Sequence, residues 1–145
     1  MNADTRKRDW RASDARLPAS GPHSLSERAF RQGDVPAVRR FTRAFGVRAG
    51  IGTARLADFV LAVSEAAACA TGVGPCTARV RLWMAGSRAY CEVHGDGLLL
   101  QRSPRGPRPG EEEAMRRRVL RQLSDFVSIA SGPDGVWVQL SMRVA

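Results

Sequence analysis

The 145-residue sequence predicts an α+β protein, a two-layer sandwich in which a mostly antiparallel sheet is covered on one face by about three helices. Three segments have apolar residues at steps of three and four, the spacing of helices that bury one side. Elsewhere, apolar and polar residues alternate between short Gly-containing turns, which is typical of strands paired in hairpins. The predicted order is strand, helix, helix, two strands, loop, helix and two strands.

The first 23 residues differ in composition from the rest of the chain. They are polar and charged, are interrupted by Pro, Gly and Ser, and have Trp10 as their only aromatic residue. They also hold five basic residues between Arg6 and Arg16. We therefore expect a flexible basic arm at residues 1–23 and one folded domain at residues 24–145.

The first half of the domain predicts one strand and two helices. The strand is expected at Leu25–Arg31. Asp34 is a good N-cap for the first helix, and Thr53 is the expected N-cap of the second. The apolar residues of the two helices are Val38, Phe41 and Phe45, then Leu56, Phe59, Val60, Val63 and Ala67.

The second half predicts two hairpins and a third helix. Alternation at residues 79–84 and 89–93 indicates the first hairpin, with Trp83 on its polar face. A Pro- and Gly-rich loop at residues 101–110 is expected to lead into a helix that begins at Glu111. The helix should bury Met115, Val119, Leu120, Leu123 and Phe126. The last two strands are expected near residues 127–130 and 136–142, joined by a turn.

Several classes of protein are disfavoured by composition. Cys69, Cys76 and Cys91 contain no CxxC pair, and His23 and His94 stand far apart, so neither a zinc site nor a disulfide framework is indicated. No apolar run approaches the length that spans a membrane, and a cytoplasmic location is expected. The net charge of +9 suggests nucleic-acid binding, but basic and aromatic residues do not interleave, which disfavours it.

Glu65 is the only charged residue in the second half of the second predicted helix. It lies off the centre of the apolar stripe, and a Gly-Val-Gly-Pro break follows the helix at residues 72–75. One interpretation is a solvated glutamate at the edge of a helix. The other is a functional carboxylate placed near the end of that helix.

The run V-S-E-A-A-A-C-A-T-G-V-G at residues 63–74 carries a family resemblance. Together with the order of elements, it resembles the GHKL ATPase-like fold and, more narrowly, the small actinobacterial anti-sigma regulatory kinases, whose helix reads V-S-E-x-x-x-N-A-x-x-H-G. The resemblance covers residues 25–142. It implies ATP and Mg²⁺ as cofactors, a sigma factor or an anti-sigma antagonist as partner, and a homodimer.

The resemblance also assigns roles to two residues of this helix. Glu65 matches the family's catalytic glutamate, which polarises the attacking hydroxyl. Cys69 stands where the family has an asparagine whose amide oxygen binds Mg²⁺, and a neutral thiol is a poor ligand for that hard cation. The match therefore predicts a compromised metal site.

The other two family motifs are also altered. In the D-x-G-x-G motif, which binds the adenine, Gly95 takes the Asp position, Gly97 the first glycine and Leu99 the second, while Asp96 is displaced by one residue. The glycine-rich start of the last helix corresponds to residues 113–118, which contain no glycine. These positions predict a degenerate nucleotide site.

Three hypotheses follow for function. The first is a regulatory protein of the anti-sigma type that acts by protein–protein interaction and has a degenerate nucleotide site. The second is an active ATP- and Mg²⁺-dependent serine kinase that phosphorylates an anti-sigma antagonist. The third is a basic nucleic-acid-binding protein. A structural role for Glu65 also stays open, in which it pairs with an arginine of residues 102–108.

Overall fold

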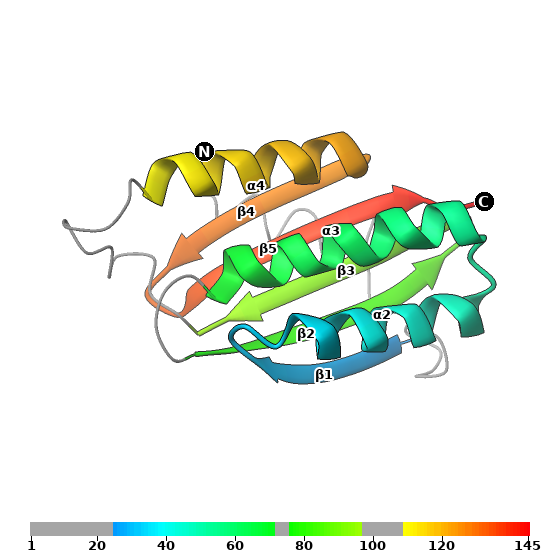
Figure 1. Cartoon of the computed structure of the whole chain (residues 1–145), viewed down its shortest axis with the longest axis horizontal. Coiled ribbons are helices and arrows are strands. Elements are labelled where there is room, and N and C mark those ends of the chain that lie inside the picture. The colour runs from blue at the N-terminus through cyan, green and yellow to red at the C-terminus, as the bar shows by residue number, and fades with distance from the viewer. Residues whose placement is uncertain (1–24, 72–75, 97–108) are drawn as a thin grey trace.

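The computed structural model describes residues 25–71, 76–96 and 109–145. The expected arm and Gly97 lie outside these residues. Eight elements follow one another in the predicted order (Figure 1). Their bounds are β1 (Leu25–Arg31), α2 (Val35–Ala49), α3 (Thr53–Thr71), β2 (Thr77–Ala85), β3 (Arg88–Gly95), α4 (Pro109–Leu123), β4 (Phe126–Gly132) and β5 (Gly135–Arg143).

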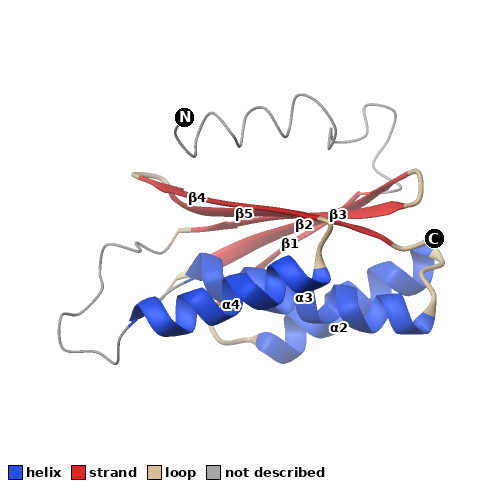
Figure 2. Ribbon diagram, turned by 90° about the horizontal axis from the view of Figure 1, so that it is seen from above, coloured by secondary structure: helices blue, strands red, loops and turns tan. Residues whose placement is uncertain are grey.

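The five strands form one antiparallel sheet in the order β1-β2-β3-β5-β4. β5 lies between β3 and β4, so the C-terminal strand is the neighbour of the central hairpin. The three helices cover one face of this sheet, with α3 between α2 and α4 (Figure 2). The predicted two-layer α+β sandwich is confirmed at this level of description.

Local sequence signals explain where α2 begins and ends. The side chain of Asp34 accepts a hydrogen bond from the backbone N–H of Ala37 at 3.3 Å, as expected of an N-cap. Gly50 ends the helix in the left-handed conformation, at φ 78°. Thr53 is the first helical residue of α3 rather than its N-cap, because the carbonyl of Gly52 already accepts from the N–H of Leu56 at 2.8 Å.

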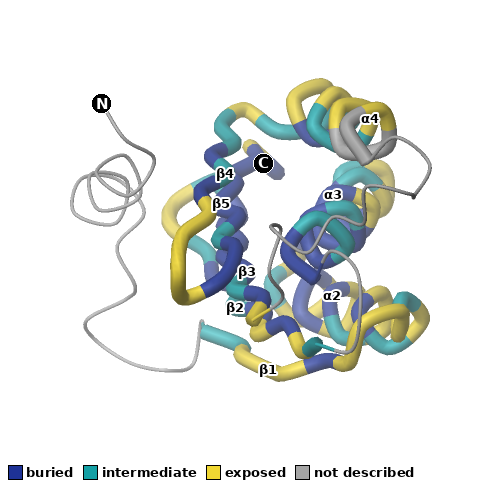
Figure 3. The backbone as a smooth tube through the Cα atoms, turned by 90° about the vertical axis from the view of Figure 1, so that its left-hand side faces the viewer, coloured by how far each residue is buried: buried dark blue, intermediate teal, exposed yellow. Residues whose placement is uncertain are grey.

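The core lies between α3 and the inner face of the sheet, where buried residues gather (Figure 3). All five predicted apolar residues of α3 are buried. Small residues continue the buried side of this helix, and Ala62, Ala66 and Ala70 are fully buried. Because alanine side chains are short, the helix backbone can approach β3 closely.

The prediction for α4 is wrong in three details. The helix begins at Pro109, two residues before Glu111, because a proline is tolerated in the first turn, where its missing N–H has no helical acceptor. Met115 is 64% exposed rather than buried. Phe126 lies beyond the end of the helix and is the first residue of β4. Leu120 is buried and Leu123 packs against the core, so the described core contacts of α4 come from its second half.

The outer face of the sheet is more buried than simple alternation predicts. Trp83 is only 1% exposed and stacks on Tyr90, its direct neighbour across β2 and β3, with ring centroids 5.6 Å apart. Leu25 and Phe126 pack against this pair. The expectation that Trp83 lies on a polar face is therefore wrong, because cross-strand aromatic stacking builds a second small cluster there.

Within residues 25–71, 76–96 and 109–145, no helix combines the length and the apolar character needed to cross a membrane.

Candidate functional site

The second half of α3, the end of β3 and the middle of α4 bring together the residues singled out by sequence. Glu65 and Cys69 lie one turn apart on α3, while Gly95 ends β3 and Asp96 follows it. Gly97 falls outside the described residues. The other four positions all lie in described parts of the chain.

Glu65 is partly exposed and has a cationic neighbour. Its Oε2 atom lies 3.7 Å from Nε of Arg116 on α4, and the two side chains are 29% and 36% exposed. This ion pair joins the central helix to α4. The predicted pairing of Glu65 with an arginine of residues 102–108 involves residues outside the described part of the chain.

Cys69 is half-buried and packs against the hydrophobic core. A thiol in this position contributes to packing and offers no oxygen ligand to a hard cation. Among the described residues, no group of three or more His, Cys, Asp and Glu side chains is arranged to hold a metal ion.

Gly95 is required by the fold. A Cβ atom added to it would overlap the carbonyl oxygen of Ala70 at the end of α3. The position aligned with the family's adenine-binding aspartate therefore has no room for a side chain. The same contact explains why α3 can lie so close to β3.

Asp96 is exposed, and its carboxylate is bound to the neighbouring strand. One oxygen accepts from the backbone N–H of Thr77 at 2.8 Å, and the other accepts from its hydroxyl at 3.0 Å. The pKa of Asp96 is lowered, chiefly because this N–H stabilises the charged form, with a further contribution from the hydroxyl. The N–H of Asp96 also donates to the Thr77 carbonyl at 3.1 Å. Asp96 therefore closes the end of the β2–β3 pair.

His94 and Ser64 carry the residue types used in acid–base and nucleophilic chemistry, and both have structural contacts. His94 stacks on Trp137 with ring centroids 4.0 Å apart and donates from Nε2 to the carbonyl of Asp134 at 2.7 Å. The buried hydroxyl of Ser64 donates to the carbonyl of Val60 at 2.8 Å. No nucleophile–base pair is formed by these two residues.

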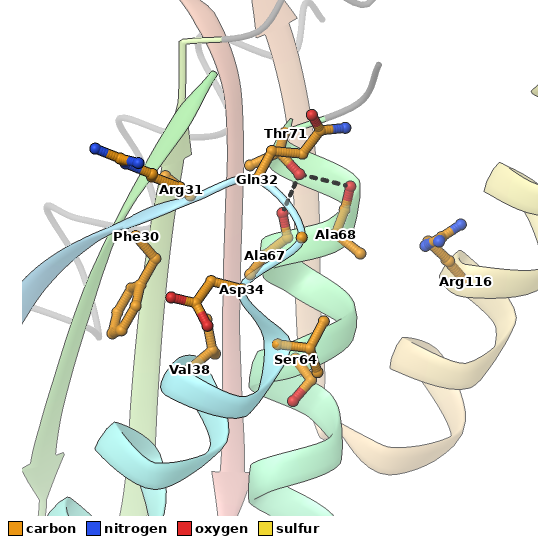
Figure 4. Close-up of a pocket in the computed structure, with 13 residues that line it drawn as sticks. Phe30, Arg31, Gln32, Asp34, Val38, Ser64, Ala67, Ala68, Thr71 and Arg116 are labelled. Carbon is orange, nitrogen blue, oxygen red and sulfur yellow. Dashed lines mark hydrogen bonds between the residues drawn. The ribbon is translucent and has the colours of Figure 1, made fainter. Parts of the chain in front are cut away.

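A cavity of about 190 Å³ lies beside the second half of α3 (Figure 4). The β1–α2 turn, the start of α2 and Arg116 of α4 enclose it. Its volume is below the roughly 300–1,000 Å³ typical of pockets for drug-sized ligands. Glu65, Cys69 and Asp96 are not among its lining residues, whereas Ser64, Ala67, Ala68 and Thr71 are.

Sequence reasoning did not find this cavity. The hydroxyl of Thr71 donates to the carbonyls of Ala67 at 3.0 Å and Ala68 at 3.3 Å, so this side of α3 presents methyl groups and hydroxyls already bonded to the helix. The row of small residues on α3 is the sequence feature that could have indicated a cavity. Whether those residues line one depends on where the β1–α2 turn lies, which their spacing does not show. The cavity is therefore lined by Ser64 and other small residues of the family-matched run, while Arg116 both lines the cavity and pairs with Glu65.

No protein-family model matches the chain, and neither does any curated protein sequence.

Proposed function

We propose that this protein is a regulatory binding module of the anti-sigma type, which contacts a sigma factor or an anti-sigma antagonist and has a degenerate nucleotide site. The proposal is supported by the residues at positions 63–65, by the order of the elements and by the single covered face of the sheet. A regulatory module of this kind acts through its surface, so it needs no complete set of catalytic groups.

The contact between Asp96 and Thr77 is the observation that carries the proposal. An aspartate that recognises adenine must direct an oxygen at the amino group of the base. Both oxygens of Asp96 accept hydrogen bonds from Thr77 instead. Gly95, the aligned position, is held against Ala70 and has no side chain to replace it.

The surroundings of Glu65 and Cys69 also support a degenerate site. Mg²⁺ prefers oxygen ligands in a near-octahedral arrangement, and the thiol of Cys69 replaces the expected amide oxygen. Glu65 already interacts with Arg116, which must move before the carboxylate can accept a proton from a substrate hydroxyl. A family member with these substitutions is expected to retain the fold and lose efficient phosphoryl transfer.

Calorimetric titration with ATP, in the presence and absence of Mg²⁺, tests the nucleotide part of the proposal. We expect no gain in ATP affinity from Mg²⁺. The Cys69→Asn variant restores the missing oxygen, and we expect it to leave ATP binding weak because Asp96 remains bonded to Thr77. A large Mg²⁺-dependent gain in the wild-type protein would contradict the proposal and favour the active-kinase hypothesis.

The partner part needs a separate measurement. Two-hybrid assays against the sigma factors and anti-sigma antagonists of the source organism should identify at least one interaction. That interaction should survive Glu65→Gln, because the carboxylate has no catalytic role in a binding module. Absence of every such interaction, with the folded protein expressed, would contradict the proposed function.

A further inference from the structure

Helix α2 carries a concentration of positive charge on its exposed side. Arg39, Arg40, Arg43 and Arg48 are all exposed, and the chain contains no acidic residue between Asp34 and Asp58. The first turn of the helix has no acid either. We call the surface formed by Arg39, Arg40, Arg43, Val47 and Arg48 the α2 arginine face.

The fold does not use most of these charges. Within the described part of the chain, no carboxylate lies within ion-pairing distance of Arg39, Arg40 or Arg43, and Arg48 donates to the hydroxyl of Ser26 at 3.2 Å. Arginines elsewhere in the described residues do find carboxylates: the pairs are Arg55–Asp58, Arg79–Glu27, Arg81–Glu27, Arg81–Glu92, Arg88–Asp125 and Arg116–Glu65. Clustered like charges repel one another, so the α2 arginine face does not stabilise the isolated protein.

An apolar hollow lies within this charged surface. Arg40, Arg43, Ala44, Val47 and Arg48 line a shallow, open depression. Val47 is 67% exposed, although its neighbours Phe45 and Gly46 are buried. An exposed aliphatic side chain surrounded by guanidinium groups gives the surface two kinds of affinity, because carboxylates can bind at its rim and a methyl-bearing side chain in its centre.

We propose that the α2 arginine face docks an acidic amphipathic segment of a partner protein. Carboxylates of the segment would pair with Arg39, Arg40 and Arg43, and an aliphatic side chain would contact Ala44 and Val47. The proposal deepens the proposed function, on which it rests because a regulatory module requires a partner. It names the chemistry by which that partner is recognised.

Two other occupants fit the surface less well. A second copy of the chain cannot place α2 against α2, because a two-fold interface would bring the same arginines together. Nucleic acid would neutralise the arginines, but its phosphate backbone offers no apolar group to cover the exposed Val47. Charge complementarity together with the apolar hollow therefore favours an acidic protein segment.

Fluorescence anisotropy with defined probes tests this proposal. The main probe is a labelled helical peptide with glutamates spaced three and four residues apart around one central leucine. The matched probes are the same peptide with every glutamate replaced by glutamine, the peptide with serine in place of leucine, and a short DNA duplex. We expect the acidic peptide with leucine to bind most tightly.

The double variant Arg40→Glu/Arg43→Glu removes the proposed contacts. We expect it to weaken binding of the acidic peptide by at least about tenfold, because it replaces attraction with repulsion at two contacts. The control is Arg118→Glu/Arg121→Glu, which changes the net charge equally at exposed positions of α4. The control should change affinity by less than about threefold, since long-range charge effects are screened by salt.

Val47→Ser tests the apolar part of the docking surface. It should weaken binding of the leucine-containing peptide by about threefold to tenfold. The serine-containing peptide has no aliphatic side chain to contact Val47, so its affinity should be the same for the wild type and this variant. The milder Arg40→Gln/Arg43→Gln variant, with circular dichroism of all variants, separates a loss of binding from a loss of folding.

Three results would overturn the docking proposal. The first is equal weakening by the α2 and α4 double variants, because net charge alone would then explain binding. The second is tighter binding of the DNA duplex with no effect of Val47→Ser, which would assign the face to nucleic acid. The third is failure of the folded wild-type protein to bind the acidic peptide.

Mg²⁺-dependent ATP binding would instead contradict the proposed function and leave the docking result unchanged.

Discussion

Gln139 donates a hydrogen bond from Nε2 to Oε2 of Glu92 over 3.0 Å, and the two residues are direct neighbours across β3 and β5. Glu92 is 2% exposed and Gln139 is 1% exposed. Arg81, on the other side of Glu92, lies 3.5 Å from its second oxygen. A buried carboxylate on the sheet face opposite the helices is therefore compensated by both neighbouring strands.

Replacing Gln139 with alanine should destabilise the protein because it leaves the buried Glu92 with one fewer hydrogen-bond donor and opens a small void. We expect the free energy of unfolding to fall by about 2–3 kcal/mol. Urea denaturation followed by circular dichroism measures it. Gln122→Ala, at an exposed position of α4, is the control and should change stability by less than about 0.5 kcal/mol. Equal effects of the two changes would contradict the role given to Gln139.

Asp96 should contribute to stability in a pH-dependent way. Its pKa is lower in the folded state than in the unfolded state, mainly because the N–H of Thr77 donates to the carboxylate. The contribution is thus present above the unfolded pKa of about 3.9 and is lost as the pH falls through the folded pKa. Asp96→Asn should reduce stability at neutral pH, and the difference from the wild type should shrink below about pH 4.

Denaturation curves between neutral and acidic pH test this prediction. The matched control is Asp58→Asn, which removes a carboxylate whose observed partner is the exposed side chain of Arg55. A difference between Asp96→Asn and the wild type that stays constant over the whole pH range would show that the charge of Asp96 does not matter.

A methyl group at Gly95 should be strongly destabilising, because the Cβ atom would overlap the carbonyl oxygen of Ala70 and backbone atoms cannot move aside as a flexible side chain can. We expect Gly95→Ala to reduce the free energy of unfolding by about 2–3 kcal/mol or more. Gly132→Ala is the control, since a Cβ there has no neighbour within 4 Å. Comparable melting temperatures for the two variants would show that α3 does not lie against β3 as described.

Glu65→Gln separates the candidate roles of the residue on α3 that matches the family's catalytic glutamate. In a binding module we expect no change in partner affinity and no phosphotransfer by either form of the protein. The ion pair with Arg116 is partly exposed, so its loss should lower stability by less than about 1 kcal/mol. Phosphotransfer that is present in the wild type and lost in the variant would favour the kinase hypothesis. A fall in stability of several kcal/mol would assign Glu65 a mainly structural role.

Most of the fold could be predicted from sequence because its signals are local. The helical spacing of Leu56, Phe59 and Val63 and the alternation around Val80 and Val93 depend only on the two periods of regular structure, and all five residues are buried. The N-cap at Asp34 is likewise set by residues within one turn. Met115 was misassigned because spacing shows which side of a helix is apolar, and not how far along its length the helix meets the sheet.

The candidate site depends on contacts that sequence order does not contain. By itself, the sequence determined that Cys69 replaces an oxygen ligand and that Asp96 is shifted by one residue. The tertiary structure alone decided that Asp96 bonds to Thr77, that Gly95 lies against Ala70 and that Arg116 reaches Glu65. These contacts join residues 19 to 51 positions apart, and their geometry is set by the packing of α3 on the sheet and on α4. Spacing along a chain determines the face of the helix or strand on which a side chain lies. The residue that it contacts depends on which element packs against that face.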